Sequence, residues 1–101
     1  MIKLALFARL EAKPGKEAAV ADLLATGLTL AREEATTPIW FALRLSPTAF
    51  GVFDAFHDEA GRQAHLAGPI AQALMANAEL FAKPPSIEPI EVLGLKNNGA
   101  V

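Results

Sequence analysis

The 101-residue chain contains no cysteine and no tyrosine, and it has one tryptophan and two histidines. Without cysteine, the chain can form no disulfide, provide no thiolate nucleophile and offer no sulfur ligand to a metal. The nine Lys and Arg residues are scattered along the sequence, and the formal net charge is -2. Nucleic-acid binding usually needs a clustered basic surface, so this composition argues against a nucleic-acid partner.

The N-terminal apolar segment lacks the features of a targeting or membrane-spanning sequence. Residues 1–10 include Lys3 and Arg9, are too few to cross a bilayer, and are followed by no small-residue cleavage site. We interpret this segment as a strand, and we expect a cytoplasmic protein with no membrane partner. The sequence contains no phosphate-binding loop, dinucleotide fingerprint or metal-ligand spacing, so we expect neither a cofactor nor a metal site.

Hydrophobic residues make up 52% of the chain and charged residues only 20%. A chain of this length typically forms one domain, which buries roughly two thirds of its unfolded surface. So high an apolar content in a small domain indicates that a partner covers some of the surface. We expect a single domain over residues 1–96 and a loose tail over residues 97–101.

Periodic apolar residues and turn signals predict four strands and two helical regions. Alternation with period two is typical of strands, spacing of three to four residues is typical of helices, and Pro or Gly interrupts both. The expected strands are residues 2–12, 39–45, 50–56 and 87–95, and the expected helices are 15–34, 59–66 and 69–81. This β-α-β-β-α-β order predicts an α+β, ferredoxin-like antiparallel sheet with its helices on one face.

Local signals refine this scheme at three places. The short turn over residues 46–49 predicts that the second and third strands form a hairpin. Asp58 is a good N-cap for the second helical region, and Pro69 suits the first position of the helix that follows. Pro89 within the last strand predicts an edge position or a bulge.

Bulky apolar side chains occur on both faces of the predicted strands. Trp40 points opposite to its neighbour Phe41. Phe53 likewise points opposite to Phe56. Two helices about 10 Å across cover only one face of a four-stranded sheet that is roughly 19 Å wide. We therefore expect a homodimer with Trp40, Phe53 and Phe7 at its interface, the alternative being a monomer with scattered exposed aromatics.

Three segments resemble one known family. LALFARLEAKPGKE at residues 4–17 resembles the first strand and helix start of the antibiotic biosynthesis monooxygenase-like domain. FDAFHD at residues 53–58 resembles its third-strand ending, and AHLAGP at residues 64–69 resembles its helix break. The resemblance implies a dimeric α+β barrel with a pocket between sheet and helices. It also implies oxidation of a small phenolic, quinol or polyketide-like aromatic by O2, often without metal or flavin.

The sequence departs from this family at residues that its members use. Related haem-degrading proteins have an Asn, an aromatic and a His where this chain has Ala8, Phe56 and Met75; two of the three are absent, which argues against haem. Polyketide-oxidising members use a Tyr, which this chain lacks. A non-catalytic module that binds a small ligand or a partner is therefore an open alternative. A lyase or isomerase acting on a small aromatic or lactone is another.

Two residues are candidates for the chemistry. Oxygenation without a cofactor needs a base that deprotonates an electron-rich substrate in a dry pocket. His65 is a candidate general base or hydrogen-bond donor; the alternative is a helix-end histidine that binds a carbonyl or faces solvent. Asp54 is a candidate acid or orienting group, because a mid-strand carboxylate is costly unless paired. An ion pair between Asp54 and Arg44 that fixes the hairpin is the alternative, and we interpret His57 as a turn residue.

The pairing register of the second and third strands decides which residues lie beside Asp54. In one register, Asp54 shares a face with Phe41 and Leu43. A slip of one residue places Arg44 on that face instead. The sequence leaves both registers open, and the residues that we expect to line the pocket are Phe41, Leu43, Phe56 and Arg44.

Overall fold

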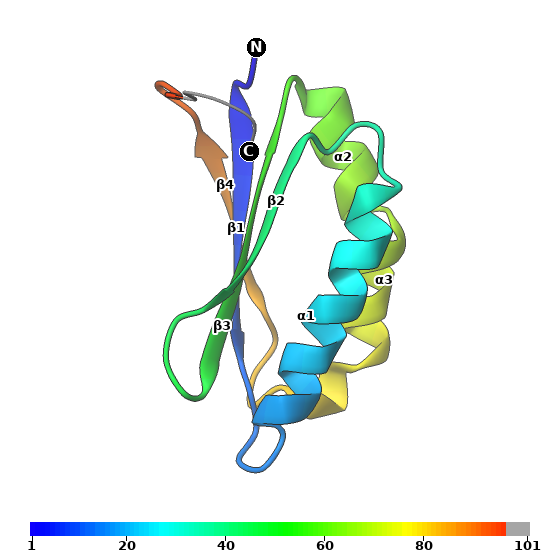
Figure 1. Cartoon of the computed structure of the whole chain (residues 1–101), viewed down its shortest axis with the longest axis vertical. Coiled ribbons are helices and arrows are strands. Elements are labelled where there is room, and N and C mark those ends of the chain that lie inside the picture. The colour runs from blue at the N-terminus through cyan, green and yellow to red at the C-terminus, as the bar shows by residue number, and fades with distance from the viewer. Residues whose placement is uncertain (97–101) are drawn as a thin grey trace.

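A four-stranded antiparallel sheet and a layer of helices form the structure, which is a computed structural model (Figure 1). The structure describes residues 1–96, and the predicted tail over residues 97–101 lies outside the described residues. The strands are β1 (Leu4–Glu11), β2 (Ile39–Arg44), β3 (Ala49–Phe56) and β4 (Ser86–Glu91). The helices are α1 (Glu17–Arg32), α2 (Glu59–Leu66), α3 (Pro69–Ala76) and the short 3-10 helix η1 (Ala78–Leu80). The predicted element order and the ferredoxin-like α+β class are confirmed.

Local signals place most of the element boundaries. Asp58 caps α2, because its Oδ1 accepts a hydrogen bond of 2.8 Å from the backbone N–H of Gly61. Pro69 is the first residue of α3, where its missing N–H costs nothing. Gly15 has a φ of 83° in the turn before α1, a conformation that other residues rarely adopt.

The last helical segment is shorter than predicted. Apolar spacing predicted a helix to residue 81, but α3 ends at Ala76 and the chain continues through Asn77 into η1. Asn77 donates a side-chain hydrogen bond of 2.8 Å to the carbonyl oxygen of Ala73. Such local bonds from Asn to the backbone compete with a regular helix, which accounts for the early end of α3.

The strand order is β2-β3-β1-β4, so β4 is an edge strand, as Pro89 predicted. In the β2–β3 hairpin, Arg44 pairs with Phe50 and Trp40 pairs with Asp54. This is the slipped register. It places Asp54, Trp40 and Arg44 on the face that the helices cover, because residues paired across strands project to the same side. The structure therefore selects between the two registers that the sequence left open.

The core lies between the sheet and α1. The buried stripe of α1 comprises Val20, Leu24, Gly27 and Ala31, and it faces buried strand residues that include Leu10, Phe50 and Val52. A Cβ on Gly27 would lie 3.3 Å from the ring of Trp40, so the glycine makes room for the indole. Trp40 thus belongs to the helix-covered side of the sheet. It does not share a face with Phe7 and Phe53, with which we had grouped it as an interface residue.

The opposite side of the sheet, here called the outer face, carries a group of large apolar side chains. Phe53 pairs with Phe7 on β1 and with Phe41 on β2, and the rings of Phe41 and Phe53 lie 6.4 Å apart between centroids. Phe41 is 45% exposed. Among the described residues, no helix covers the outer face (Figure 1). The large apolar residues of this face are Phe7, Ile39, Phe41, Leu43, Phe53 and Ile90, and the charged residues Arg9, Glu11 and Glu88 lie on the same face.

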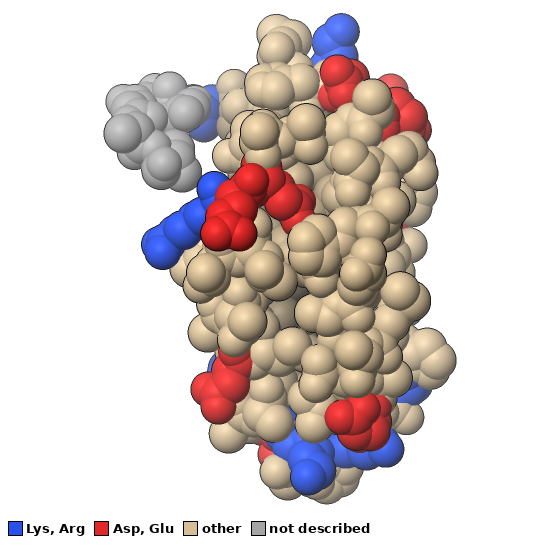
Figure 2. All heavy atoms as spheres, turned by 90° about the vertical axis from the view of Figure 1, so that its right-hand side faces the viewer, with Lys and Arg blue, Asp and Glu red and all other residues tan. Residues whose placement is uncertain are grey.

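The helix side of the molecule has no continuous charged surface. Figure 2 shows Lys, Arg, Asp and Glu in separate groups toward the two ends of this side, with uncharged atoms between them. Over residues 1–96, no helix combines the length and apolar character needed to cross a membrane.

Candidate functional site

His65 lies between two carboxylates in the interior of the protein. It occupies the last turn of α2 and is only 7% exposed. Its Nε2 lies 2.7 Å from Oδ2 of Asp54 on β3. Its Nδ1 lies 2.7 Å from Oε1 of Glu34, which follows the end of α1. We call these three residues the acid-histidine cluster.

Three separate elements bring the cluster together. The β2–β3 register directs Asp54 toward the helices. Gly61, one turn before His65 in α2, lets this helix approach the segment after α1, because a Cβ at Gly61 would lie 3.0 Å from the carbonyl oxygen of Thr36. That close approach brings His65 within reach of Glu34, which is distant from it in the sequence.

Two further side chains hold the cluster in place. Thr37 donates its hydroxyl to Oε1 of Glu34 over 2.8 Å, and the same hydroxyl lies 3.5 Å from Nδ1 of His65. The ring of Phe56 packs against the imidazole, with centroids 5.5 Å apart. Because both ring nitrogens of His65 have carboxylate partners, the orientation of the imidazole is determined on both sides.

Burial and hydrogen bonding shift the proton affinities of Asp54 and His65. Burial raises the pKa of Asp54 above its usual value of 3.8, and this effect outweighs its hydrogen bond to His65. Burial by itself would lower the pKa of His65, but hydrogen bonds to Asp54 and Glu34 outweigh it and raise the pKa above 6.5. Asp54 and His65 therefore hold their protons more tightly than the same groups would in water.

Each carboxylate of the cluster keeps one oxygen without a partner. Oδ1 of Asp54 and Oε2 of Glu34 are buried, and neither accepts a hydrogen bond from a described residue. An unpaired buried acceptor typically costs about 1–3 kcal/mol. Such incomplete pairing is common where a polar group serves a substrate rather than the fold.

A small inner cavity touches the cluster. Asp54 and His65 form its polar wall, and the rest of its lining is apolar, from Leu6 on β1 to Ile70 on α3. Its volume is about 40 Å³, which is room for about two water molecules.

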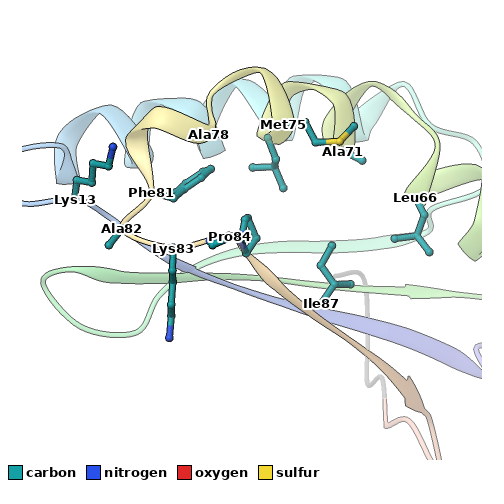
Figure 3. A pocket seen from close by; sticks show the side chains of 12 residues that line it. Lys13, Leu66, Ala71, Met75, Ala78, Phe81, Ala82, Lys83, Pro84 and Ile87 are labelled. Atoms are coloured by element: carbon teal, nitrogen blue, oxygen red, sulfur yellow. The ribbon is translucent and has the colours of Figure 1, made fainter.

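A much larger cleft lies beside the inner cavity, between α3 and β4 (Figure 3). We call it the apolar cleft; its volume is about 630 Å³. The side chains that line both spaces, and so form the wall between them, are Leu66, Ala71, Leu74 and Ile87. These four side chains therefore separate the apolar cleft from Asp54.

The lining of the apolar cleft carries charge of one sign only. Its lining residues include Lys13 and Lys83 but no acidic residue. Figure 3 shows Lys13 at the opposite end of the cleft from Leu66, and Lys83 directed away from α3. Lys13 is thus the cation best placed to meet a ligand that extends from the end near Leu66.

The structure brings together only part of the predicted pocket. His65, Asp54 and Phe56 meet, whereas Phe41 and Leu43 project from the outer face because of the register. Arg44 shares the face of Asp54 but does not pair with it. Its guanidinium lies 4.5 Å above the centroid of the Phe50 ring, and its Nη1 donates a hydrogen bond to the carbonyl oxygen of Pro47.

Glu34 and Thr37 did not emerge from the sequence analysis. One signal for Glu34 was available: a carboxylate just after the C-terminus of a helix faces the negative end of the helix dipole and needs a compensating partner.

The carboxylates of Asp54 and Glu34 bind different nitrogens of His65 and do not converge on one point where a metal ion could sit. In the part of the chain that the structure describes, no group of three or more His, Asp or Glu side chains is arranged to hold a metal ion.

The chain matches no known family model and no curated protein. It is similar, however, to solved structures. A protein of unknown function from Nitrosomonas europaea is 62% identical over 99% of this chain and 98% of that one, with a TM-score of 0.94. A candidate antibiotic biosynthesis monooxygenase from Deinococcus radiodurans is 21% identical over 96% and 99% of the two chains, with a TM-score of 0.79. A further candidate monooxygenase, also from Nitrosomonas europaea, is 16% identical over 90% of each chain, with a TM-score of 0.80.

The similar solved structures identify the fold of this chain. The sheet, its helices and their order are those of the solved structures named as candidate antibiotic biosynthesis monooxygenases, so the chain shares their fold. By its sequence it belongs to one family with the Nitrosomonas europaea protein of unknown function.

Proposed function

We propose that this protein is a cofactor-independent monooxygenase that acts on a small phenolic, quinol or polyketide-like aromatic, with Asp54 as its general base. The observation that carries the proposal is the free Oδ1 of Asp54, which is buried and unpaired in the described structure. Asp54 also forms part of the wall of the inner cavity, beside the apolar cleft. Structures with this fold that are named as candidate monooxygenases support the same reaction class.

The geometry favours Asp54 over His65 as the group that meets the substrate. Both nitrogens of His65 already face carboxylates at 2.7 Å, so the ring has no free position for a substrate proton. Burial raises the pKa of Asp54, which brings it closer to that of a phenol and makes it a better base. His65 donates to Oδ2 and leaves Oδ1 for the substrate.

The reaction balances without a metal or flavin. For a phenol with a free para carbon, phenol and O2 give quinone and water. Asp54 takes the phenolic proton, the phenolate passes one electron to O2, and the resulting superoxide bonds to the para carbon as a peroxide. Asp54 then returns its proton to the peroxide. Loss of the para C–H proton forms the carbonyl and breaks the O–O bond, so that the second oxygen leaves as water.

The surroundings of Asp54 suit this chemistry. A dry, low-dielectric site disfavours competing proton transfer with water and keeps the phenolate reactive. The apolar cleft has the volume of a typical small-molecule site. Its lysines favour a substrate that carries negative charge at the end away from Asp54.

The proposed enzyme works as a homodimer. The outer face carries a group of large apolar side chains and has no helix over it among the described residues, and stacking two such faces would remove Phe41, Phe53 and Phe7 from water. This arrangement leaves the apolar cleft, on the other side of the sheet, open to substrate.

One observation favours a second candidate function, a non-catalytic module that binds a small ligand. The inner cavity at Asp54 holds only about 40 Å³, so a ligand can occupy the apolar cleft without reaching a proton acceptor. In that case, binding would proceed with no consumption of O2.

Oxygen uptake separates the two functions. The protein is mixed with a series of phenols, naphthols and quinols, and O2 consumption is followed with an electrode beside an enzyme-free control. We expect turnover that falls by about a hundredfold or more in Asp54→Asn and is unchanged in Asp22→Asn, which alters an exposed carboxylate. Ligand binding without O2 uptake would support the binding module instead.

A further inference from the structure

Glu34 completes a chain of three buried ionisable groups although it lies away from the inner cavity. Its Oε1 meets Nδ1 of His65 at 2.7 Å, on the opposite side of the ring from Asp54. Its side chain is 14% exposed, against 3% for that of Asp54. It does not line the inner cavity, so any effect that it has on a substrate must pass through His65.

The position of Glu34 is costly for the fold alone. It follows the C-terminal end of α1, where the helix dipole disfavours negative charge. Its Oε2 is buried without a partner among the described residues. A neutral hydrogen-bond acceptor would orient the imidazole equally well, so the carboxylate contributes something that orientation does not require.

Charge accounting shows what the carboxylate contributes. With Asp54 and Glu34 ionised and His65 protonated, the cluster has a net charge of -1, and a proton from the substrate makes it neutral. Without the charge of Glu34, the same proton would leave a net charge of +1 in a dry site. Uptake of a proton by Asp54 is then less favourable, because isolated charges are costly in a low dielectric.

We propose that Glu34 is a positioning residue for the reaction: acting through His65, it orients the imidazole toward Oδ2 of Asp54 and strengthens Asp54 as a base. Thr37 fixes Glu34 by donating its hydroxyl to the same oxygen that meets His65. This role rests on the proposed monooxygenase function.

Glu34→Gln separates the charge from the shape. The amide oxygen of Gln can still accept hydrogen bonds from Nδ1 of His65 and from Thr37, so orientation is kept while the negative charge is lost. We expect kcat to fall by about tenfold or more with little change in KM. We also expect the acidic limb of the rate profile to move to lower pH, because the charge of Glu34 contributes to the raised pKa of Asp54. Glu33→Gln, which alters the exposed neighbour, should change neither.

Two variants of Thr37 test whether its hydroxyl holds Glu34 in place. Thr37→Val removes the hydroxyl while keeping a similar volume, and Thr37→Ser keeps the hydroxyl. We expect Val to lower kcat and Ser to restore it, while Thr36→Val, at an exposed position, leaves kcat unchanged. A reduced kcat in Thr37→Ser equal to that in Thr37→Val would contradict a role for the hydroxyl.

Nuclear magnetic resonance of the ligand-free protein gives a readout that does not depend on turnover. Both carboxylates raise the pKa of His65, so its titration midpoint should move to lower pH in Glu34→Gln and stay in place in Glu33→Gln. An unchanged midpoint in Glu34→Gln would overturn the coupling.

Different results would contradict the positioning role of Glu34 and the proposed monooxygenase function. Full kcat and an unshifted rate profile in Glu34→Gln, with an active wild type, would overturn the positioning role alone. A wild-type protein that turns over no phenol or quinol would overturn the proposed function and this role with it, whatever the titration of His65 shows.

Discussion

Nε2 of His65 on α2 lies 2.7 Å from Oδ2 of Asp54 on β3, and both side chains are buried. This contact joins the helix layer to the centre of the sheet. It also makes His65 the common partner of two carboxylates, since Glu34 occupies its other nitrogen. The stability of the fold and the proposed chemistry therefore depend on the same three residues.

Replacement of His65 should affect both the stability of the fold and the proposed chemistry. His65→Gln retains one polar group but cannot bridge both carboxylates, which would then face each other in the interior without a cation. We expect a loss of about 3–5 kcal/mol in the free energy of unfolding, typical for removing one partner of a buried pair. Urea denaturation measures this change. His57→Gln is the matched control at an exposed histidine and should stay within about 0.5 kcal/mol of the wild type.

The raised pKa values of His65 and Asp54 determine whether the fold becomes more or less stable as pH rises. His65 binds its proton more tightly in the folded than in the unfolded chain, because its hydrogen bonds to Asp54 and Glu34 overcome burial and raise its pKa above 6.5. Its contribution to stability is thus complete below that value and is lost as pH rises through the raised, folded-state pKa. Asp54, whose pKa burial raises above 3.8, acts in the same direction at lower pH.

We therefore expect the Tm to fall as pH rises above 6.5, through the raised pKa of folded His65. Circular dichroism melts across this range measure the slope. The slope should become flatter in His65→Gln and remain in His57→Gln. An equally steep decline in His65→Gln would show that other groups cause it.

The fold was predictable from local patterns because each pattern acts over a few residues. Pro and Gly breaks, alternation in the strands and the cap at Asp58 each specify structure independently of the rest of the chain. Pro89 likewise indicated an edge strand from its own chemistry. The boundary at Asn77 was missed because one side-chain hydrogen bond overrode an apolar pattern that continues to Phe81.

The candidate site was predictable only in part because it depends on relations between elements. His65 and Asp54 stood out as a rare histidine and a mid-strand carboxylate. Their partner Glu34 did not, because its contact requires the close approach of α2 to the segment after α1 that Gly61 allows. The register, which a turn of four residues sets, decided that Phe41 lies on the outer face and not beside Asp54.

The apolar cleft should discriminate between ligands by charge. Lys13 lies at the end away from Leu66, and no acidic residue lines the cleft. We expect anilinonaphthalene sulfonate to bind more tightly than the uncharged phenylnaphthylamine. Lys13→Met should reduce this preference by about 1.5-fold to fivefold, as expected for loss of one exposed ion pair.

Fluorescence titration at low salt measures both affinities, and Lys16→Met at an exposed lysine serves as the control. Equal losses for both probes in Lys13→Met would indicate a change of shape rather than of charge. Loss of the preference in Lys16→Met as well would indicate a general surface effect.

The outer face should determine the oligomeric state. We expect sedimentation equilibrium to give a mass near twice the 10.7 kDa of the chain. Phe41→Glu places a charge within the proposed interface, on the edge strand β2, where the ring is 45% exposed in the isolated subunit. Burying an unpaired charge is costly, so this variant should dissociate into folded monomers at micromolar concentration.

The control for this experiment lies on the opposite side of the molecule. Leu28 on α1 is 38% exposed, and Leu28→Glu should leave the dimer intact because α1 covers the other side of the sheet. A wild-type protein that stays at one subunit mass up to about millimolar concentration would contradict the dimer. It would also mean that Phe41, Phe53 and Phe7 remain in contact with water, which small soluble domains tolerate only for limited apolar patches.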